Sequence, residues 1–224
     1  MSTSVVDAVT QYERTPFHIG EFVHCAVVVD DDLFKYYVNG VFQGTQGHQR
    51  EGSFAYAKGL PESFQITAPY DTGLVLGPVG PNARDNVHAQ ILELRVSSTV
   101  RYPDEFTPQT TRFTQDDETI ALYHCDDGNA SLLKDASGNT YHGEIDGATW
   151  VNPVRGRQSQ SIEEENYALF FDGSDVFVEL PDLSDEVGER FTLEAWVQPA
   201  DFRNGAIAEI DTGESTCTLT CRTD

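Results

Sequence analysis

The sequence is poor in lysine, methionine and long apolar runs. Its 224 residues include three lysines, Lys35, Lys58 and Lys134, and one methionine. No run approaches the roughly 18 consecutive apolar residues that a membrane-spanning helix needs. The first residues also lack the basic and then apolar layout of a signal peptide. We therefore expect no insertion into a membrane.

Positive charge is scarce as well. Lys and Arg together number 14 against 37 Asp and Glu, which gives a formal net charge of -23. Such a surface repels phosphate backbones, so we expect no nucleic-acid partner. The same balance is typical of proteins that stay soluble in salty water or that meet divalent cations. A solvated acidic surface is the simpler interpretation.

Cysteine is present four times, as Cys25, Cys125, Cys217 and Cys221, without a C-x-x-C pair. This spacing removes the argument for a zinc site or a thioredoxin-like motif. On one strand, Cys217 and Cys221 would lie about 13 Å apart, too far for a mutual disulfide. Cys25 and Cys125 sit in apolar patterns, where a thiol behaves as a small hydrophobe. The cysteine pattern does not decide between an oxidising and a reducing compartment.

Strand patterns dominate what is present, and no stretch has the caps and period of a helix. Residues 22–29 form an apolar run and residues 33–38 alternate, which predicts two strands. The three acids at 30–32 between them are more typical of a hairpin turn than of a cation site. Asn39 and Gly40 predict a second tight hairpin turn.

Further short strands are expected at residues 74–76, 89–96, 119–125, 167–171, 176–180 and 191–197. Residues 45–73 form a long connection, and such loops on β-scaffolds often carry binding residues. Short strands separated by Gly, Pro, Asn and Asp predict an all-β sandwich or barrel. The length allows one large sandwich or two smaller units.

Two groups of motifs cover nearly the whole chain. The first holds HCAVVVD at 24–30, YVNG at 37–40, LELRVS at 92–97 and RYPDEFTP at 101–108. The second holds TIALYHCDDG at 119–128, DASGN at 135–139, FDGSD at 171–175 and FTLEAWV at 191–197. They resemble, respectively, the closing and the opening elements of laminin G-like domains, in the concanavalin A-like lectin and glucanase superfamily.

The resemblance implies an antiparallel, concanavalin A-like jelly-roll sandwich. It makes residues 1–112 the late half of one domain and residues 113–224 the early half of the next. Either the chain is a piece of a tandem array, or its halves close on each other as a circular permutant. The missing signal peptide and the abrupt end favour a truncated reading frame. The strand edges that each half would leave unburied favour closure.

The function that the resemblance implies is a non-catalytic carbohydrate- or protein-binding adhesion module. It would belong to a larger secreted or cell-surface protein and bind a glycan or an extracellular protein next to neighbouring domains. Candidate ligand contacts are Trp196, Glu194 and Tyr70. Alternation along residues 191–197 places Trp196 and Glu194 on one face, and an exposed aromatic ring packs against sugar C–H groups. The alternatives are a covered face, which makes Trp196 structural, and a ligand-free spacer repeat.

The resemblance also implies a possible Ca²⁺ site. Asp126, Asp127 and Asp172 are the candidate ligands, because carboxylate oxygens suit this cation. The family commonly has Ile-Asp-Glu where this chain has Ile-Leu-Glu at 91–93. One acid is therefore missing, and the alternative is that the three residues form solvated turns.

A glucanase is the catalytic alternative. Glu209, Asp211 and Glu214 have the E-x-D-x-x-E spacing of laminarinase-type glucanases, as nucleophile, electrostatic helper and acid/base. Thr212 and Gly213 stand where apolar residues would hold the last Glu on the strand, and no Trp-Pro pair precedes the motif. We therefore expect that the chain is not an enzyme and has no catalytic residue. The motif at 209–214 is expected to be a strand that ends in an acidic turn.

Overall fold

The computed structural model describes residues 19–31, 33–47, 74–77, 87–128, 130–153, 167–183, 185–201, 205–211 and 216–221. Regular structure within these ranges is entirely β. The strands are β1 (Val23–Asp30), β2 (Leu33–Val38), β3 (Val41–Gly47), β4 (Leu74–Leu76), β5 (His88–Ser97), β6 (Thr119–Tyr123), β7 (Leu132–Leu133), β8 (Gly143–Asp146), β9 (Thr149–Val151), β10 (Ala168–Asp172), β11 (Phe177–Glu179), β12 (Arg190–Pro199), β13 (Gly205–Asp211) and β14 (Thr216–Cys221). None of the described segments is a helix with the length and apolarity that crossing a bilayer takes.

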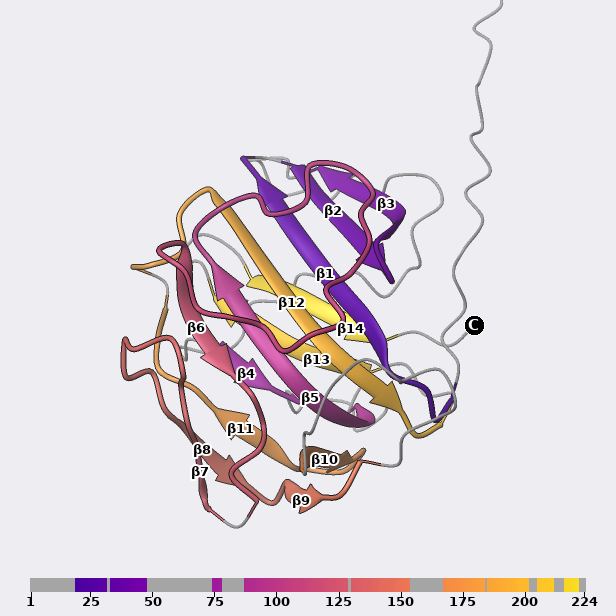
Figure 1. Cartoon of the computed structure of the whole chain (residues 1–224), viewed down its shortest axis with the longest axis vertical. Coiled ribbons are helices and arrows are strands. Elements are labelled where there is room, and N and C mark those ends of the chain that lie inside the picture. The colour runs from indigo at the N-terminus through magenta and orange to yellow at the C-terminus, as the bar shows by residue number, and fades with distance from the viewer. Residues whose placement is uncertain are drawn as a thin grey trace, which may run out of the picture.

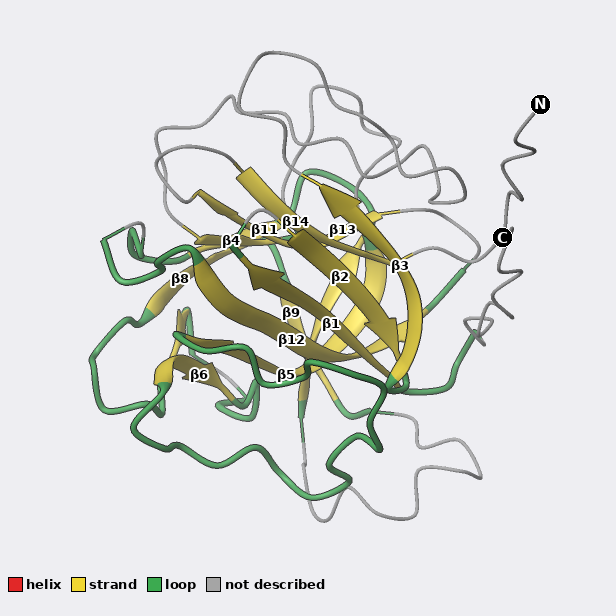
Figure 2. Ribbon diagram, turned by 90° about the horizontal axis from the view of Figure 1, so that it is seen from above, coloured by secondary structure: helices red, strands yellow, loops and turns green. Residues whose placement is uncertain are grey.

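The described strands form two antiparallel sheets. Sheet 1 has the order β3-β2-β1-β12-β5-β10-β9, and β6 also pairs with β5. Sheet 2 has the order β14-β13-β4-β11-β8-β7. Sheet 1 lies in front of sheet 2 in Figure 1, and the two layers are seen from above in Figure 2. The prediction of an all-β, antiparallel sandwich is confirmed.

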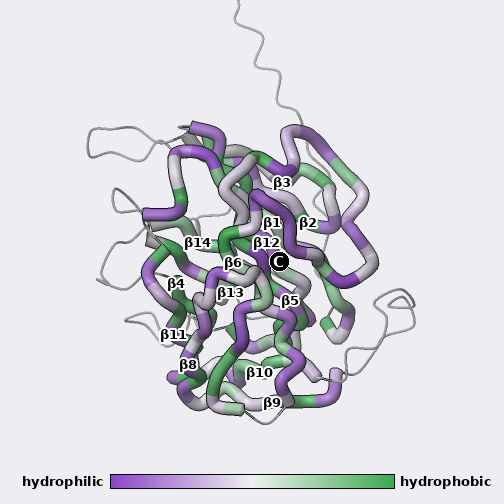
Figure 3. The backbone as a smooth tube through the Cα atoms, turned by 60° about the vertical axis from the view of Figure 1, so that its left-hand side comes forward, coloured by the Kyte–Doolittle hydropathy of each residue, from purple (hydrophilic) through white to green (hydrophobic). Residues whose placement is uncertain are grey.

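The main core lies between the sheets. Leu193, Ala195 and Val197 of β12 are fully buried there, as are Leu74 and Leu76 of β4. Each large apolar side chain removed from water in this way stabilises the fold by about 1.5–3 kcal/mol. Hydrophobic colour accordingly gathers on the strands in Figure 3, and hydrophilic colour on the connecting loops.

Strands from the two predicted halves alternate in both sheets. In sheet 1, β12 of the second half lies between β1 and β5 of the first. In sheet 2, β4 of the first half lies between β13 and β11 of the second. The described pairings of β4 and β5 are all with strands of the second half. Neither half could therefore satisfy its own strand edges.

The tight turns have the predicted backbone. Asn39 and Gly40 between β2 and β3 have φ angles of 50° and 76°, and Asp31 between β1 and β2 has a φ of 54°. Positive φ at both central residues is what the Asn-Gly hairpin turn requires. Both hairpins are therefore confirmed.

Three of the cysteines lie inside the sandwich. Cys25, Cys125 and Cys217 are buried, which confirms the expectation for the first two. Burial, with a contribution from the negative charge of Glu209, raises the pKa of the Cys217 thiol to about 12. This thiol is therefore neutral and unreactive at physiological pH.

Candidate functional site

The face of sheet 1 that points away from sheet 2, called the outer face here, is polar along its two central strands. On β12, Leu193, Ala195 and Val197 point into the core, so the residues between them point outward. The outward cross-strand pairs of β12 and β5 are Thr192 with Ser97, Glu194 with Arg95, Trp196 with Glu93, and Gln198 with Gln90. The predicted sharing of one face by Trp196 and Glu194 is thus confirmed.

A long segment, residues 98–118, crosses the outer face, and we call it the strap. It follows β5 and passes in front of β12 and β1 before reaching β6 (Figure 1). In Figure 2 it forms a third layer on the side of sheet 1 away from sheet 2. The predicted half boundary at residues 112 and 113 lies in this strap, where Phe113 is buried. The boundary is therefore packed against the sheet.

Backbone and aromatic contacts hold residues 102–106 of the strap against the β2–β3 hairpin. The amide of Phe106 donates to the carbonyl of Gly40 at 3.0 Å, and the Lys35 ammonium donates to the carbonyl of Pro103 at 2.7 Å. The rings of Tyr102 and Phe106 stack, with centroids 3.6 Å apart. Strap and hairpin thus share a small apolar cluster outside the main core.

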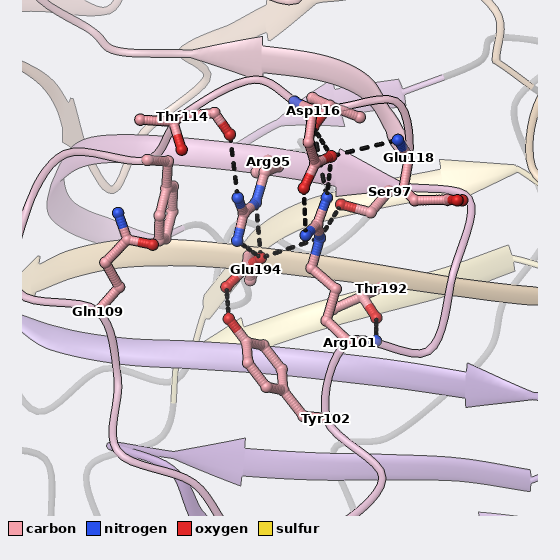
Figure 4. A network of polar contacts seen from close by, with 12 residues as sticks. Arg95, Ser97, Arg101, Tyr102, Gln109, Thr114, Asp116, Glu118, Thr192 and Glu194 are labelled. Carbon is pink, nitrogen blue, oxygen red and sulfur yellow. Dashed lines mark hydrogen bonds and ion pairs between the residues drawn. The ribbon is translucent and has the colours of Figure 1, made fainter.

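Glu194 is the centre of the polar contacts beneath the strap (Figure 4). Its carboxylate is fully buried and accepts hydrogen bonds from Arg95 Nε at 2.8 Å, His24 Nε2 at 2.9 Å and Tyr102 Oη at 2.7 Å. An ionised carboxylate is tolerated inside a protein only with such partners. The three donors come from β5, β1 and the strap, so one buried charge joins three parts of the fold.

These partners decide the protonation state of Glu194. Burial by itself raises the pKa of the carboxyl group, because it removes water from the charged form. The hydrogen bond and charge of His24, the charge of Arg95 and the hydrogen bond of Tyr102 outweigh burial. The net effect lowers the pKa of Glu194, so the group is ionised at neutral pH.

Arg101 fastens the strap to itself and to the sheet. Its guanidinium contacts both carboxylate oxygens of Asp116 at 2.9 and 2.7 Å and donates to Ser97 Oγ at 2.5 Å. Its backbone amide donates to Thr192 Oγ1 at 3.0 Å. The hydrogen bonds from Arg101, with a contribution from Thr119, keep the pKa of Asp116 well below its usual value.

Glu93 is a second buried carboxylate on the outer face. It accepts the backbone amide of Phe113 at 3.1 Å, and His124 Nδ1 lies 2.6 Å from it. The Arg95 guanidinium lies over the Phe113 ring, 4.6 Å from its centroid, a cation–π arrangement. Two buried carboxylates therefore hold the strap, Glu194 at Tyr102 and Glu93 at Phe113.

Two of the predicted ligand residues, Trp196 and Glu194, are covered by the strap. Trp196 is 8% exposed and Glu194 is 0% exposed. Trp196 packs in a cluster with Leu92 and Phe113, and its buried Nε1 has no hydrogen-bond partner. This arrangement favours the alternative in which the face is covered and Trp196 is structural. Tyr70, the third predicted ligand residue, lies outside the described residues.

The three candidate calcium ligands each have another partner. Asp126 pairs with Arg112, Asp127 with Lys134, and Asp172 accepts hydrogen bonds from its neighbour Ser174. In the part of the chain that the structure describes, no group of three or more His, Cys, Asp or Glu side chains could hold a metal ion. The geometry fits turn-forming acids better, and calcium stays a prediction.

Of the glucanase motif, Glu209 and Asp211 lie on β13, while Glu214 lies outside the described residues. Ala208 and Ile210 belong to the core, so Glu209 between them points away from it. Its cross-strand neighbours are Thr218 and Val75. The described residues thus give one outward carboxylate of the proposed pair.

Beyond the strap, the outer face of sheet 1 is partly exposed around Phe170. Leu169 and Phe171 point into the core, so Phe170 and Asp172 point outward from β10. Phe170 lies between Gln90 of β5 and Thr149 of β9, and Asp172 lies opposite His88. We call His88, Gln90, Thr149, Phe170 and Asp172 the Phe170 patch. Thr149 and Asp172 are exposed and the other three are partly exposed.

Sequence reasoning missed this patch except for Asp172. The run of apolar residues at 168–171 has no polar residue to mark its outward side. Its partner strand β9 has three residues, and its pairing with β10 was not predicted, so the neighbours of Phe170 could not be known. The alternation of strand faces would have grouped Phe170 with Asp172, had one face of the strand been known.

Comparison of the chain with protein-family models, with curated proteins and with solved structures finds no match in any of the three. The resemblance to laminin G-like domains therefore rests on the motifs alone.

Proposed function

We propose that the chain is a non-catalytic recognition and adhesion module that binds carbohydrate or protein outside the cell or on its surface. One observation carries the proposal. The outer face of sheet 1 is covered at one end by the strap and partly exposed at the other, where the Phe170 ring lies among polar side chains. Ligand sites combine apolar or aromatic surface with a few fixed polar groups in this way.

The rigidity of the scaffold supports this proposal. The open patch lies on β5, β9 and β10, all paired strands of one sheet. Binding residues on strands are held more exactly in place than residues on loops, so less entropy is lost when a ligand binds. The three hydrogen bonds to the buried Glu194 carboxylate under the strap add to this rigidity.

We further propose that the sandwich is a laminin G-like, concanavalin A-like jelly roll closed as a circular permutant. The order of the motifs, late elements before early ones, supports this, and so does the alternation of strands from both halves in both sheets. A single cooperative melt of the monomeric chain, followed by near-UV circular dichroism, is expected. Two separate transitions would contradict closure into one unit.

The recognition function is tested by binding of the purified chain to immobilised glycans and matrix proteins. The panel contains neutral gluco-, manno- and galacto-oligosaccharides, heparin, polygalacturonate, collagen and fibronectin. Saturable binding to any member, reversed by the same compound in solution, supports a recognition module. Absence of binding to all of them would leave the ligand-free spacer repeat as the better account.

A glucanase remains the second candidate, because Glu209 points away from the core on a paired strand. Hydrolysis of laminarin by the chain, abolished in both Glu209→Gln and Glu214→Gln, would establish it. Absence of reducing-sugar release from laminarin, or release that both variants retain, would exclude this mechanism.

A further inference from the structure

We propose that the Phe170 patch is a saccharide subsite that takes an uncharged hexose ring, with Phe170 as its stacking platform. The inference rests on the proposed recognition function and narrows it to one site and one class of ligand. It is carried by the position of Phe170, by its polar neighbours and by the charge of the surroundings.

Phe170 is a partly exposed ring that the protein holds in place. His88 contacts it edge to face, with ring centroids 5.5 Å apart and an interplanar angle of 61°. The imidazole is itself fixed, because His88 Nδ1 lies 2.7 Å from Asp201 Oδ2. Asp201 follows the end of β12, and the amide of Ala200 bonds to the His88 carbonyl at 2.9 Å. The ring is therefore preorganised to accept a flat apolar partner, and the C–H face of a sugar is one.

Hydrogen-bonding groups flank the ring on two sides. Gln90 and Thr149 are its direct cross-strand neighbours, at the separation of about 4.5–5.5 Å that such pairs have. Asp172 stands two residues further along the same strand face. An amide, a hydroxyl and a carboxylate around one ring can donate to and accept from the hydroxyl groups of a sugar.

Gln90 carries an unfilled hydrogen bond. Its Oε1 is buried and has no partner. A buried acceptor without a donor is costly, and native structures have few of them. The fold therefore does not fix the amide group of Gln90 through its oxygen, and this side chain can reorient to meet a ligand hydroxyl.

The charge of the described residues disfavours acidic sugars. Among these residues, Asp172 and Asp201 are the carboxylates beside Phe170 and His88, and strands β9 and β10 contain no Lys or Arg. The hydrogen bonds that Ser174 donates lower the pKa of Asp172, so this carboxylate is ionised at neutral pH. With a net charge of -23 on the chain, sulfated sugars and uronic acids are repelled.

Phe177 on sheet 2 offers a matched comparison. It is also partly exposed, points away from the buried Val178, and lies opposite Asp146 on β8. Its outward neighbours on these two strands, Asp146, Glu144 and Glu179, are all carboxylates. It lacks the neutral amide and hydroxyl that flank Phe170, so Phe177→Ala is the control for loss of an outward phenylalanine.

The test measures binding of the full chain to immobilised neutral gluco-, manno- and galacto-oligosaccharides, with heparin and polygalacturonate as anionic probes. At least one neutral series is expected to bind and the anionic probes are not. Phe170→Ala is expected to weaken this binding about tenfold or more, because it removes the stacking surface. Gln90→Leu is expected to weaken it severalfold, and Phe177→Ala to leave it unchanged.

The outcomes separate the site from the general function. Neutral-sugar binding that persists in both Phe170→Ala and Gln90→Leu would overturn the subsite and leave the recognition module standing. Binding to heparin or to a matrix protein, without binding to any neutral sugar, would also overturn the subsite and leave the recognition module standing. Failure to bind any probe, including collagen and fibronectin, would overturn both. Melting temperatures and near-UV spectra like those of the parent chain establish that each variant is folded.

Discussion

Tyr102 donates a hydrogen bond of 2.7 Å to Oε2 of the buried Glu194, and this contact joins the strap to the central strand of sheet 1. The environment shifts the pKa values of both groups at this contact. Burial and the neighbouring carboxylate raise the pKa of Tyr102 above its usual value, which keeps it a hydrogen-bond donor. The same hydrogen bond helps to keep Glu194 charged. The strap is therefore joined to the sheet by a hydrogen bond from a neutral Tyr102 to an ionised Glu194.

Replacement of this carboxylate is expected to be strongly destabilising. Glu194→Gln keeps the shape but leaves Arg95 as a buried charge without its counter-charge, which should cost about 3–5 kcal/mol of unfolding free energy. Urea unfolding of the variant measures this loss. Glu118→Gln, an exposed strap residue, is the control and is expected to change stability by less than about 0.5 kcal/mol. Equal losses in the two variants would contradict the central role of Glu194.

Stability is expected to fall in acid. The folded-state pKa of Glu194 lies below its ordinary value of 4.5, so its contribution is complete at higher pH. The contribution is lost as the pH falls from about 4.5 through the folded-state pKa, because the unfolded chain then binds the proton more readily. Asp116, with its lowered pKa, acts in the same direction. Urea midpoints at pH 7, 5, 4 and 3 test this, and Glu194→Gln should show a shallower decline.

Gly40 should tolerate no side chain. A Cβ at this position would lie 1.8 Å from the carbonyl oxygen of Phe106, so Gly40→Ala would push the strap off the hairpin. Gly20 has the same φ of 76°, and the Cβ that alanine would add there meets no heavy atom within 4 Å, so Gly20→Ala measures backbone strain alone. We expect Gly40→Ala to lower the melting temperature much more than Gly20→Ala. Similar shifts would mean that strap contact adds nothing.

Trp196 should behave as a packing residue. Trp196→Phe removes a buried Nε1 that has no partner, which offsets part of the lost packing, so a change within about 1 kcal/mol is expected. Trp196→Ala should cost about 3–5 kcal/mol because it leaves a cavity beside Leu92 and Phe113. Chemical denaturation of both variants checks this difference. A glycan affinity that falls in Trp196→Phe with unchanged stability would instead return Trp196 to the ligand site.

Cys217 should resist alkylation while the chain is folded. Burial and the charge of Glu209 raise the pKa of its thiol to about 12, and the thiolate is the reactive form. Iodoacetamide at pH 8, followed by peptide mass spectrometry, should modify Cys217 in urea and leave it unmodified in buffer. Rapid modification in buffer would show that β14 opens readily.

Local signals predicted much of the framework. The Asn39–Gly40 turn and the strand at 191–197 were found because turn chemistry and alternation act over a few residues. The short strands β7 and β8 were missed, because two to four residues cannot establish a period. Strand β14 holds polar threonines at alternate positions and was missed although it is longer.

The candidate site was harder to predict, because burial depends on what covers a strand. Alternation correctly grouped Trp196 with Glu194, but the strap residue that contacts Glu194, Tyr102, lies 92 positions earlier in the chain. Asp126, Asp127 and Asp172 were grouped by residue type, whereas the ion pairs of Asp126 and Asp127 are with Arg112 and Lys134, which lie outside the motif at 119–128.

The sequence by itself determined the class of fold, the turns, the facing of the central strands and the acidic surface, since each depends on neighbouring residues or on composition. Only the tertiary structure decided that the two halves interleave, that the strap covers Glu194 and that Phe170 is partly exposed. These features depend on which distant strands pair, and pairing is fixed by the burial of whole sheet faces, a property of the assembled sandwich.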